Sequence, residues 1–167
     1  MYFLVPYNIS PIQQGIQAGH AVEQYARKYG NDPEYQDYVD NHMTWMVMNG
    51  GTTNSKREMG LGTPYGSLNK HADFLKEIDW KFAWFSEPDL NDALTALCFL
   101  CDERIFNNED YPHFMDWVIK EQGGSSYVIL GNGELADEEM WRKKYVDFLG
   151  GEDIVRMKDF VSTLRFA

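Results

Sequence analysis

The stretch SPIQQGIQAGHA, residues 10–21, decides the fold prediction. Ser10 precedes a proline at the first helical position and a glutamine at the third, which is the signature of a capped helix start. The pattern continues to a glycine at residue 30, so we expect a helix from Pro11 to about Tyr29. The β-prone run Tyr2–Val5 before it predicts a strand. A strand that leads into a long capped helix is typical of α/β proteins.

The next part of the chain extends this pattern. Alternating or continuous apolar runs predict three further strands, and one amphipathic segment predicts a second long helix. The strands are expected at Thr44–Met48, Trp80–Phe85 and Leu94–Leu100, and the helix at Ser67–Ile78. The residues 31–41 are expected to form a short helix or a loop. The order β-α-β-α-β-β therefore predicts an α/β fold with a small mixed sheet of about four strands flanked by helices.

The C-terminal part is mostly helical in pattern. Helices are expected at Phe114–Gln122, Asp137–Leu149 and Glu152–Leu164, and one short strand at Ser126–Leu130. A chain of 167 residues has the usual length of one domain. We therefore expect a single domain over 1–167, with a core over 1–105 and a mostly helical extension over 106–167 that packs on the core.

Composition limits the classes of function. The chain carries 26 acidic and 15 basic residues, a net charge of −11, so extended nucleic-acid binding would need a local basic patch. The charge could equally serve solubility alone. No run approaches the roughly 20 apolar residues of a membrane helix, and the N-terminus does not resemble a signal peptide. These features predict a cytoplasmic protein that does not enter a membrane.

Cysteine and histidine give no sign of a metal or cofactor site. The only cysteines, Cys98 and Cys101, have CxxC spacing but fall in a predicted strand, where residues three apart face opposite sides of the sheet. The four histidines are scattered and do not form a pair at helical metal-ligand spacing. We therefore expect no metal and no cofactor.

The first predicted helix carries the best candidate for a functional face. At about 100° per residue, one polar side gathers three amides and one imidazole, from Gln13, Gln17, His20 and Gln24. The opposite side is apolar and is expected to face the sheet, with Gly15 and Gly19 allowing close approach of the backbone. This apolar side consists of Ile12, Gly15, Ile16, Gly19, Val22 and Ala26. A plain solvated helix surface is the alternative, although such surfaces usually carry Lys and Glu.

These residues resemble the type II peptidyl-tRNA hydrolases, small α/β proteins that cleave the ester between a peptide and tRNA. In that family the helix after the first strand carries Gln-x-Ser-His-Ala, and residues 17–21 here read Gln-Ala-Gly-His-Ala. The acidic turn Glu87-Pro88-Asp89 is also similar. The resemblance covers roughly residues 1–102, and divergent versions of this kind look like those encoded by bacteriophages.

The resemblance implies a hydrolytic mechanism. His20 would act as the base for attack of water on an ester carbonyl, Glu87 or Asp89 would orient its imidazole, and Gln17 would hold the carbonyl or the water. Backbone amides around Gly50 to Thr53 would stabilise the oxyanion. Further side chains expected to contact the ligand are Gln13, Gln24, Asn8, Thr52, Thr53, Asn91 and Thr95.

A non-catalytic function of the same fold is the alternative. The family lysine near the site corresponds to Gln13, and the basic groups that would hold phosphate are replaced. Amides can recognise a ligand without catalysis, so the protein could sequester a nucleotide-like ligand or inhibit a host protein. The partners to consider are therefore tRNA or a nucleotide-like ligand, a host protein, and a second copy of the chain in a homodimer. A scaffold role through the aromatic C-terminal helices is a third option.

Overall fold

The computed structural model describes residues 1–59, 62, 64–123 and 137–167, which fall into two compact units. Unit 1 comprises residues 1–100 and 164–167, and unit 2 comprises residues 101–163. The division after residue 100 lies near the boundary expected after residue 105. That the helical part packs on the core as one domain stays a prediction. In the described residues, no helix is long and apolar enough to cross a membrane.

Unit 1 is built on a four-stranded mixed sheet in the order β2-β1-β4-β3, which confirms the predicted fold class. The strands are β1 (Tyr2–Pro6), β2 (Met46–Gly51), β3 (Phe82–Glu87) and β4 (Ala93–Phe99). Strand β1 pairs parallel with β2 and antiparallel with β4, and β4 pairs antiparallel with β3. Strands β1, β2 and β3 therefore all run in the same direction, and their carboxyl ends lie at the same end of the sheet.

Helix α1 (Pro11–Tyr29) begins as predicted. Ser10 and Gln13 form a reciprocal capping box, and the helix ends at Gly30. The face that packs on β3 and β4 differs from the predicted one, because it consists of Gln17, Ala18, Ala21 and Tyr25. The small alanines let the helix lie close to the sheet, and Tyr25 fills the space beside them in the core.

The expectation that Gly15 and Gly19 face the sheet was wrong. A Cβ atom added at either position would meet nothing within 4 Å, apart from the helix's own backbone and the adjacent residues. The isoleucines of the same side also point to solvent, since Ile12 is 78% and Ile16 is 52% exposed. The helix is thus rotated relative to the prediction, which brings Gln17 inside and leaves an apolar strip outside.

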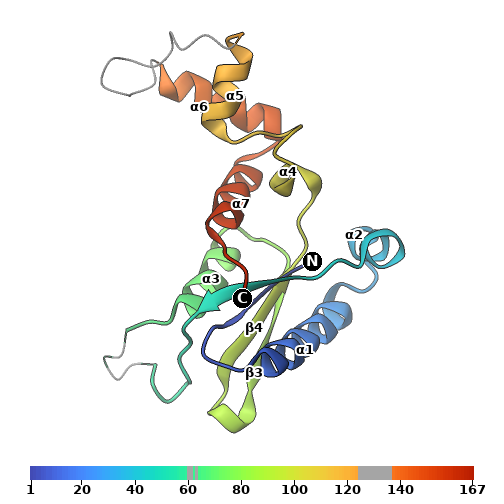
Figure 1. The fold of residues 1–167 in the computed structure, drawn as a ribbon, viewed down its shortest axis with the longest axis vertical. Coiled ribbons are helices and arrows are strands. Elements are labelled where there is room, and N and C mark those ends of the chain that lie inside the picture. The colour runs from blue at the N-terminus through green and yellow to red at the C-terminus, as the bar shows by residue number, and fades with distance from the viewer. Residues whose placement is uncertain (60–61, 63, 124–136) are drawn as a thin grey trace. The chain divides into compact units, whose positions relative to one another are not determined.

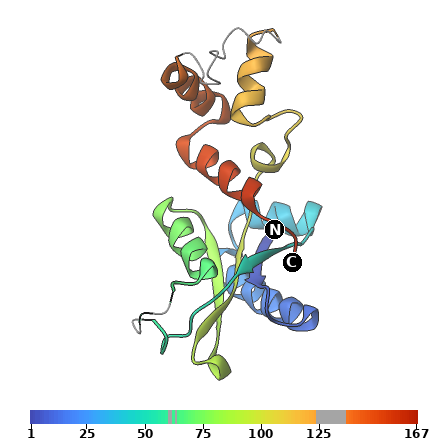
Figure 2. The same cartoon turned by 60° about the vertical axis from the view of Figure 1, so that its left-hand side comes forward.

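Helix α3 (Ser67–Glu77) covers the other face of the sheet, as Figures 1 and 2 show. Its buried side chains Leu68, Ala72 and Leu75 pack toward the sheet. A Cβ at Gly50 would lie 2.6 Å from Leu68 Cδ1 and 3.1 Å from the Val5 carbonyl oxygen, so a side chain here would displace its neighbours where β2 meets this helix. Between α1 and β2 the chain forms α2 (Pro33–Asp37) and one π-helical turn, η1 (Tyr38–His42).

The two edges of the sheet differ. The outer edge of β2 is paired by the end of the chain, with a bridge between Met48 and Phe166 and backbone hydrogen bonds to Arg165 and Ala167. Within the described residues, no strand pairs with the outer edge of β3. Strand β3 is therefore the open edge of the sheet, and α1 flanks it on one face.

Unit 2 contains α4 (Glu103–Phe106), α5 (Phe114–Glu121), α6 (Glu138–Leu149) and α7 (Glu152–Thr163). The last three confirm the predicted helices, whereas α4 was not predicted. Aromatic rings from α5 and α6 meet in its core, with Trp117 in contact with Trp141, Tyr145 and Phe148. The predicted strand Ser126–Leu130 lies outside the described residues.

Candidate functional site

A buried chain of hydrogen bonds marks the line along which α1 packs against β3, which we call the α1–β3 seam. The Gln17 amide donates to Glu87 Oε2 at 2.8 Å, and the Thr95 hydroxyl donates to Gln17 Oε1 at 2.5 Å. Gln17 and Thr95 are buried, with 8% and 1% exposure, so both ends of the amide need partners. The chain fixes the Glu87 carboxylate at the end of β3, where it is only half-buried.

His20 lies one helical turn further along the same seam. Its half-buried ring stacks on Phe85, with ring centroids 4.4 Å apart. Because Phe85 and Glu87 are two residues apart on one face of β3, His20 lies over the former and Gln17 over the latter. The imidazole has no hydrogen-bond partner among the residues that the structure describes, which leaves both ring nitrogens available.

The expected pairing of His20 with a carboxylate is not formed. Glu87 accepts its hydrogen bond from Gln17, and Asp89 lies exposed in the 3-10 turn η2 (Pro88–Leu90). The sequence could not show this arrangement, because it depends on the rotation of α1 that turns Gln17 inward.

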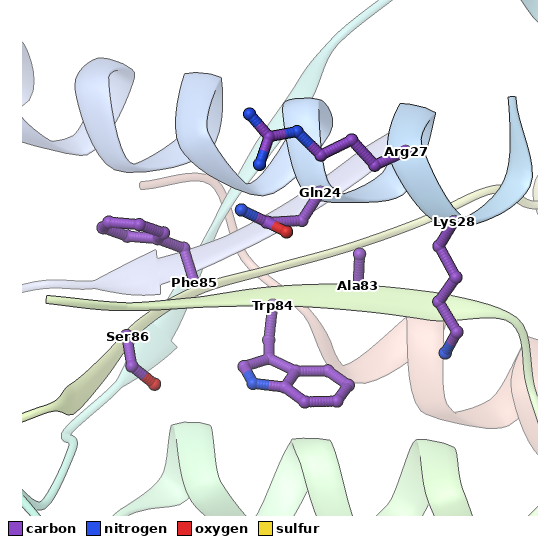
Figure 3. A pocket seen from close by; sticks show the side chains of 7 residues that line it. All are labelled: Gln24, Arg27, Lys28, Ala83, Trp84, Phe85 and Ser86. Carbon is purple, nitrogen blue, oxygen red and sulfur yellow. The ribbon is translucent and has the colours of Figure 1, made fainter.

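An open groove of about 580 Å³ continues the seam toward the C-terminal end of α1 (Figure 3). We call it the β3 groove. Figure 3 shows Gln24 and Phe85 in the space between helix and strand, and Trp84 and Ser86 on the opposite side of β3. The residues that line it are Gln24, Arg27 and Lys28 from α1, and Ala83, Trp84, Phe85 and Ser86 from β3.

Two cations of the β3 groove have no carboxylate partner. Arg27 and Lys28 are exposed, and neither forms an ion pair with any of the described residues. Lys56 and Lys81 of unit 1 are paired in contrast, Lys56 with Asp92 at 3.0 Å and Lys81 with Asp32 at 2.9 Å. Positive charge in the last turn of a helix also stabilises the helix dipole. The absence of a partner nevertheless leaves both groups free to hold an anion.

The other predicted ligand contacts lie elsewhere. Gln13 is engaged in the capping box with Ser10, and Asn8 is exposed just after β1. Asn91 is in the turn before β4 with a positive φ of 55°, and its carbonyl accepts the Lys56 amide. The structure thus brings Gln17, His20, Glu87 and Thr95 together on the seam and places Gln24 in the groove, whereas Gln13, Asn8 and Asn91 lie apart from the groove lining.

Thr52 and Thr53 have structural partners of their own. The Thr52 amide donates to Ser67 Oγ at 2.8 Å, and the Thr53 hydroxyl donates to the Leu94 carbonyl at 2.5 Å. The Gly51 amide donates to Asn49 Oδ1 at 2.8 Å. The expected oxyanion donors at Gly51 and Thr52 are therefore occupied, the first by Asn49 of β2 and the second by Ser67 of α3.

Sequence reasoning missed the aromatic and cationic part of the groove. Trp84 and Phe85 were expected only as residues of the strand Trp80–Phe85, and no role was expected for Arg27 and Lys28. These four residues line one groove because β3 is the open edge of the sheet. No local sequence pattern predicts which strand lies at an edge. The one available signal was a pair of adjacent cations at the end of a helix that otherwise carries amides.

Cys98 has a structural contact. It is fully buried, its thiol donates to the Ala21 carbonyl at 3.2 Å, and burial raises its pKa to about 12. Cys101 lies beyond the end of β4. Among the described residues, His, Cys, Asp and Glu side chains form no group of three or more that could hold a metal ion.

No protein-family model matches this sequence, and no curated protein matches it at a significant level.

Proposed function

We propose that the protein binds the phosphate-bearing end of a nucleotide or RNA strand in the β3 groove. The observation that carries this proposal is the pair Arg27 and Lys28, two exposed cations without a carboxylate partner that line one groove with an amide and aromatic rings. Phosphate is held by such cations, while amides and aromatic faces suit the edges and planes of bases.

The charge of the chain limits the size of this ligand. A net charge of −11 opposes the approach of a long polyanion, so we expect favourable contact only over a short stretch at the groove. We therefore expect a short ligand or a strand end, and binding that weakens as salt concentration rises.

The proposal is tested with a fluorescein-labelled RNA tetramer titrated with protein at low salt and followed by fluorescence anisotropy. Replacing both Arg27 and Lys28 by Ala should raise the dissociation constant about tenfold or more, because two phosphate contacts are lost. The matched control replaces Lys143 and Lys144, two exposed neighbours on α6, by Ala and changes the net charge equally. Equal weakening by both double variants, or no binding by the wild type, would refute the proposal.

Hydrolysis of an ester at the bound end is a second candidate function. It is favoured by one observation, the uncommitted imidazole of His20 on the seam beside the groove. In this reaction His20 would take a proton from water as the oxygen attacks the ester carbonyl. The protonated imidazole would then give a proton to the ribose oxygen as the ester bond breaks.

This second candidate is tested by incubating the protein with N-acetyl-aminoacyl-tRNA and following release of the N-acetyl amino acid. His20→Ala should abolish turnover. Glu87→Gln tests whether turnover depends on the negative charge of the fixed Glu87 carboxylate. Turnover that is unchanged in His20→Ala would rule out the histidine as base. Binding without any turnover would leave sequestration of the ligand as the function.

A further inference from the structure

The exposed indole of Trp84 is the feature of the β3 groove that the proposed function leaves unexplained. Its side of β3 faces away from α1, and 47% of the residue is exposed. The ring contacts Phe82 at a centroid distance of 5.6 Å in a tilted arrangement. Because β3 is the open edge of the sheet, no strand among the described residues shields the indole from that side.

Two ammonium groups lie over the ring of this indole at long distance. Lys28 Nζ is 5.8 Å and Lys76 Nζ is 6.0 Å from the ring centroid, so the indole lies within reach of one cation from α1 and one from α3. Both distances are near the outer limit of a cation–π contact, about 6 Å. Lys76 also pairs with Asp73 at 3.8 Å. Lys28 has only the ring of Tyr29, at 4.7 Å, as a closer partner among the described residues, so Lys28 is the cation that can turn toward a phosphate. An aromatic face with cations around it is the arrangement by which proteins bind unpaired bases.

We propose that the β3 groove binds single-stranded nucleic acid, with one base stacked on Trp84 and the adjoining phosphate held by Arg27 and Lys28. This inference rests on the proposed function and specifies its ligand class. A duplex keeps its bases paired and stacked inside, so it cannot offer a free base to the indole. Stacking tolerates all four bases, so the preference is for single strands and not for a sequence.

The same open edge could also accept an extended acidic peptide through backbone pairing. Two observations favour the nucleic acid. The register between β3 and β4 shifts between Phe85 and Ser86, where Thr95 of β4 is the extra residue, and such a bulge increases the local twist that an added strand would have to follow. In addition, cations lie close to an exposed indole, and a peptide that pairs through its backbone would not need to contact that ring.

The test compares four probes by fluorescence anisotropy or competition: a labelled RNA tetramer, a longer RNA duplex that contains the same sequence in paired form, inorganic phosphate, and the acidic peptide acetyl-Glu-Val-Glu-Val-Glu-Val-amide. We expect the single strand to bind at least tenfold more tightly than the duplex. Trp84→Ala should weaken single-strand binding about tenfold, whereas Trp84→Phe should retain most of it. A thermal unfolding curve checks that each variant is folded.

The outcomes separate this inference from the proposed function. If RNA binding depends on Arg27 and Lys28 but is unchanged in Trp84→Ala, or if the duplex binds equally well, the base-stacking inference is overturned and phosphate binding stands. If neither RNA nor phosphate binds, both proposals fail. Tighter binding of the acidic peptide than of RNA would overturn the inference in favour of strand addition at β3.

Discussion

The two units use their cations in opposite ways. In unit 2, Lys158 is fully buried, and its ammonium donates to the carbonyls of Arg104 and Ile105 and to Asn108 Oδ1, at 3.1, 3.3 and 2.8 Å. Burial lowers the pKa of this lysine. In unit 1, Arg27 and Lys28 stand in solvent with no carboxylate partner in the described part of the chain.

A second cation of unit 2 repeats the structural use. Arg104 pairs with Asp102 through two nitrogens and donates to the Leu149 carbonyl at 2.7 Å, at the end of α6. Lys158 and Arg104 thus satisfy carbonyls at helix ends that have no partner within the helix. The difference shows that the partners of a cation indicate its role. Cations whose donors all have partners within the protein stabilise the fold, whereas cations at a groove without such partners are available to a ligand.

The largest effect is expected from Lys158→Met. The variant keeps the length of the side chain but leaves three oxygens of unit 2 without their donor. The free energy of unfolding of unit 2 should fall by about 3 kcal/mol, because buried acceptors left unpaired are costly. Hydrogen exchange of the α7 amides measures this for the unit itself. Protection equal to that of the wild type would show that the buried ammonium is not needed for stability.

A smaller effect is expected from Thr95→Val on the seam of unit 1. The change removes the hydroxyl that donates to Gln17 and leaves a buried amide oxygen unpaired. Urea denaturation should show a loss of about 1–2 kcal/mol. The control is Thr44→Val, an exposed threonine whose hydroxyl donates only to a nearby carbonyl, and its effect should stay within about 0.5 kcal/mol. Equal losses would contradict the role given to the seam.

The rotation of α1 predicts a gain in stability. Changing Gly15 and Gly19 together to Ala should stabilise unit 1 by about 1 kcal/mol or somewhat more, since helix propensity improves and each new methyl group points into open space. Gly50→Ala is the contrast, because its Cβ would collide with Leu68 and should destabilise the same unit. Thermal unfolding measures both. A destabilised double variant would mean that the glycine face packs against something.

The smallest effect on stability is expected from the double change of Arg27 and Lys28 to Ala. These side chains have no ion pair to lose, and only their interaction with the helix dipole and the contact of Lys28 with the Tyr29 ring are removed, so the free energy of unfolding should fall by less than about 1 kcal/mol. Urea denaturation of this double variant and of Lys158→Met, measured side by side, compares the two uses of cations most directly. A loss as large as that of Lys158→Met would mean that the groove cations are structural after all.

Local patterns were sufficient to predict most of unit 1. The capping box at Ser10, the glycine stop at residue 30 and the strands depend only on neighbours in sequence, whereas the order of the strands within the sheet was not predicted. The face of α1 was predicted wrongly because apolar isoleucines were taken to point inward. Burial of Ala18, Ala21 and Tyr25 depends on the shape of the sheet beneath, which is a non-local property.

The candidate site was predictable only in part. The seam residues Gln17, His20, Glu87 and Thr95 were named from sequence, but the pairing of Gln17 with Glu87 follows from the helix rotation. The groove cations and Trp84 were missed, because their importance depends on β3 being the open edge. In unit 2, the partners of Lys158 are some 50 residues away in sequence, and no local pattern links such distant groups.

The most direct test of the central claim is a titration of isotopically labelled protein with the RNA tetramer, followed by amide chemical shifts. The account predicts shifts that concentrate at residues 24–28 and 83–86 and leave residues 137–163 unchanged. In the variant that lacks Arg27 and Lys28, the same titration should produce no shifts at these residues. Shifts confined to unit 2, or no shifts at all, would contradict the assignment of the β3 groove as the binding site.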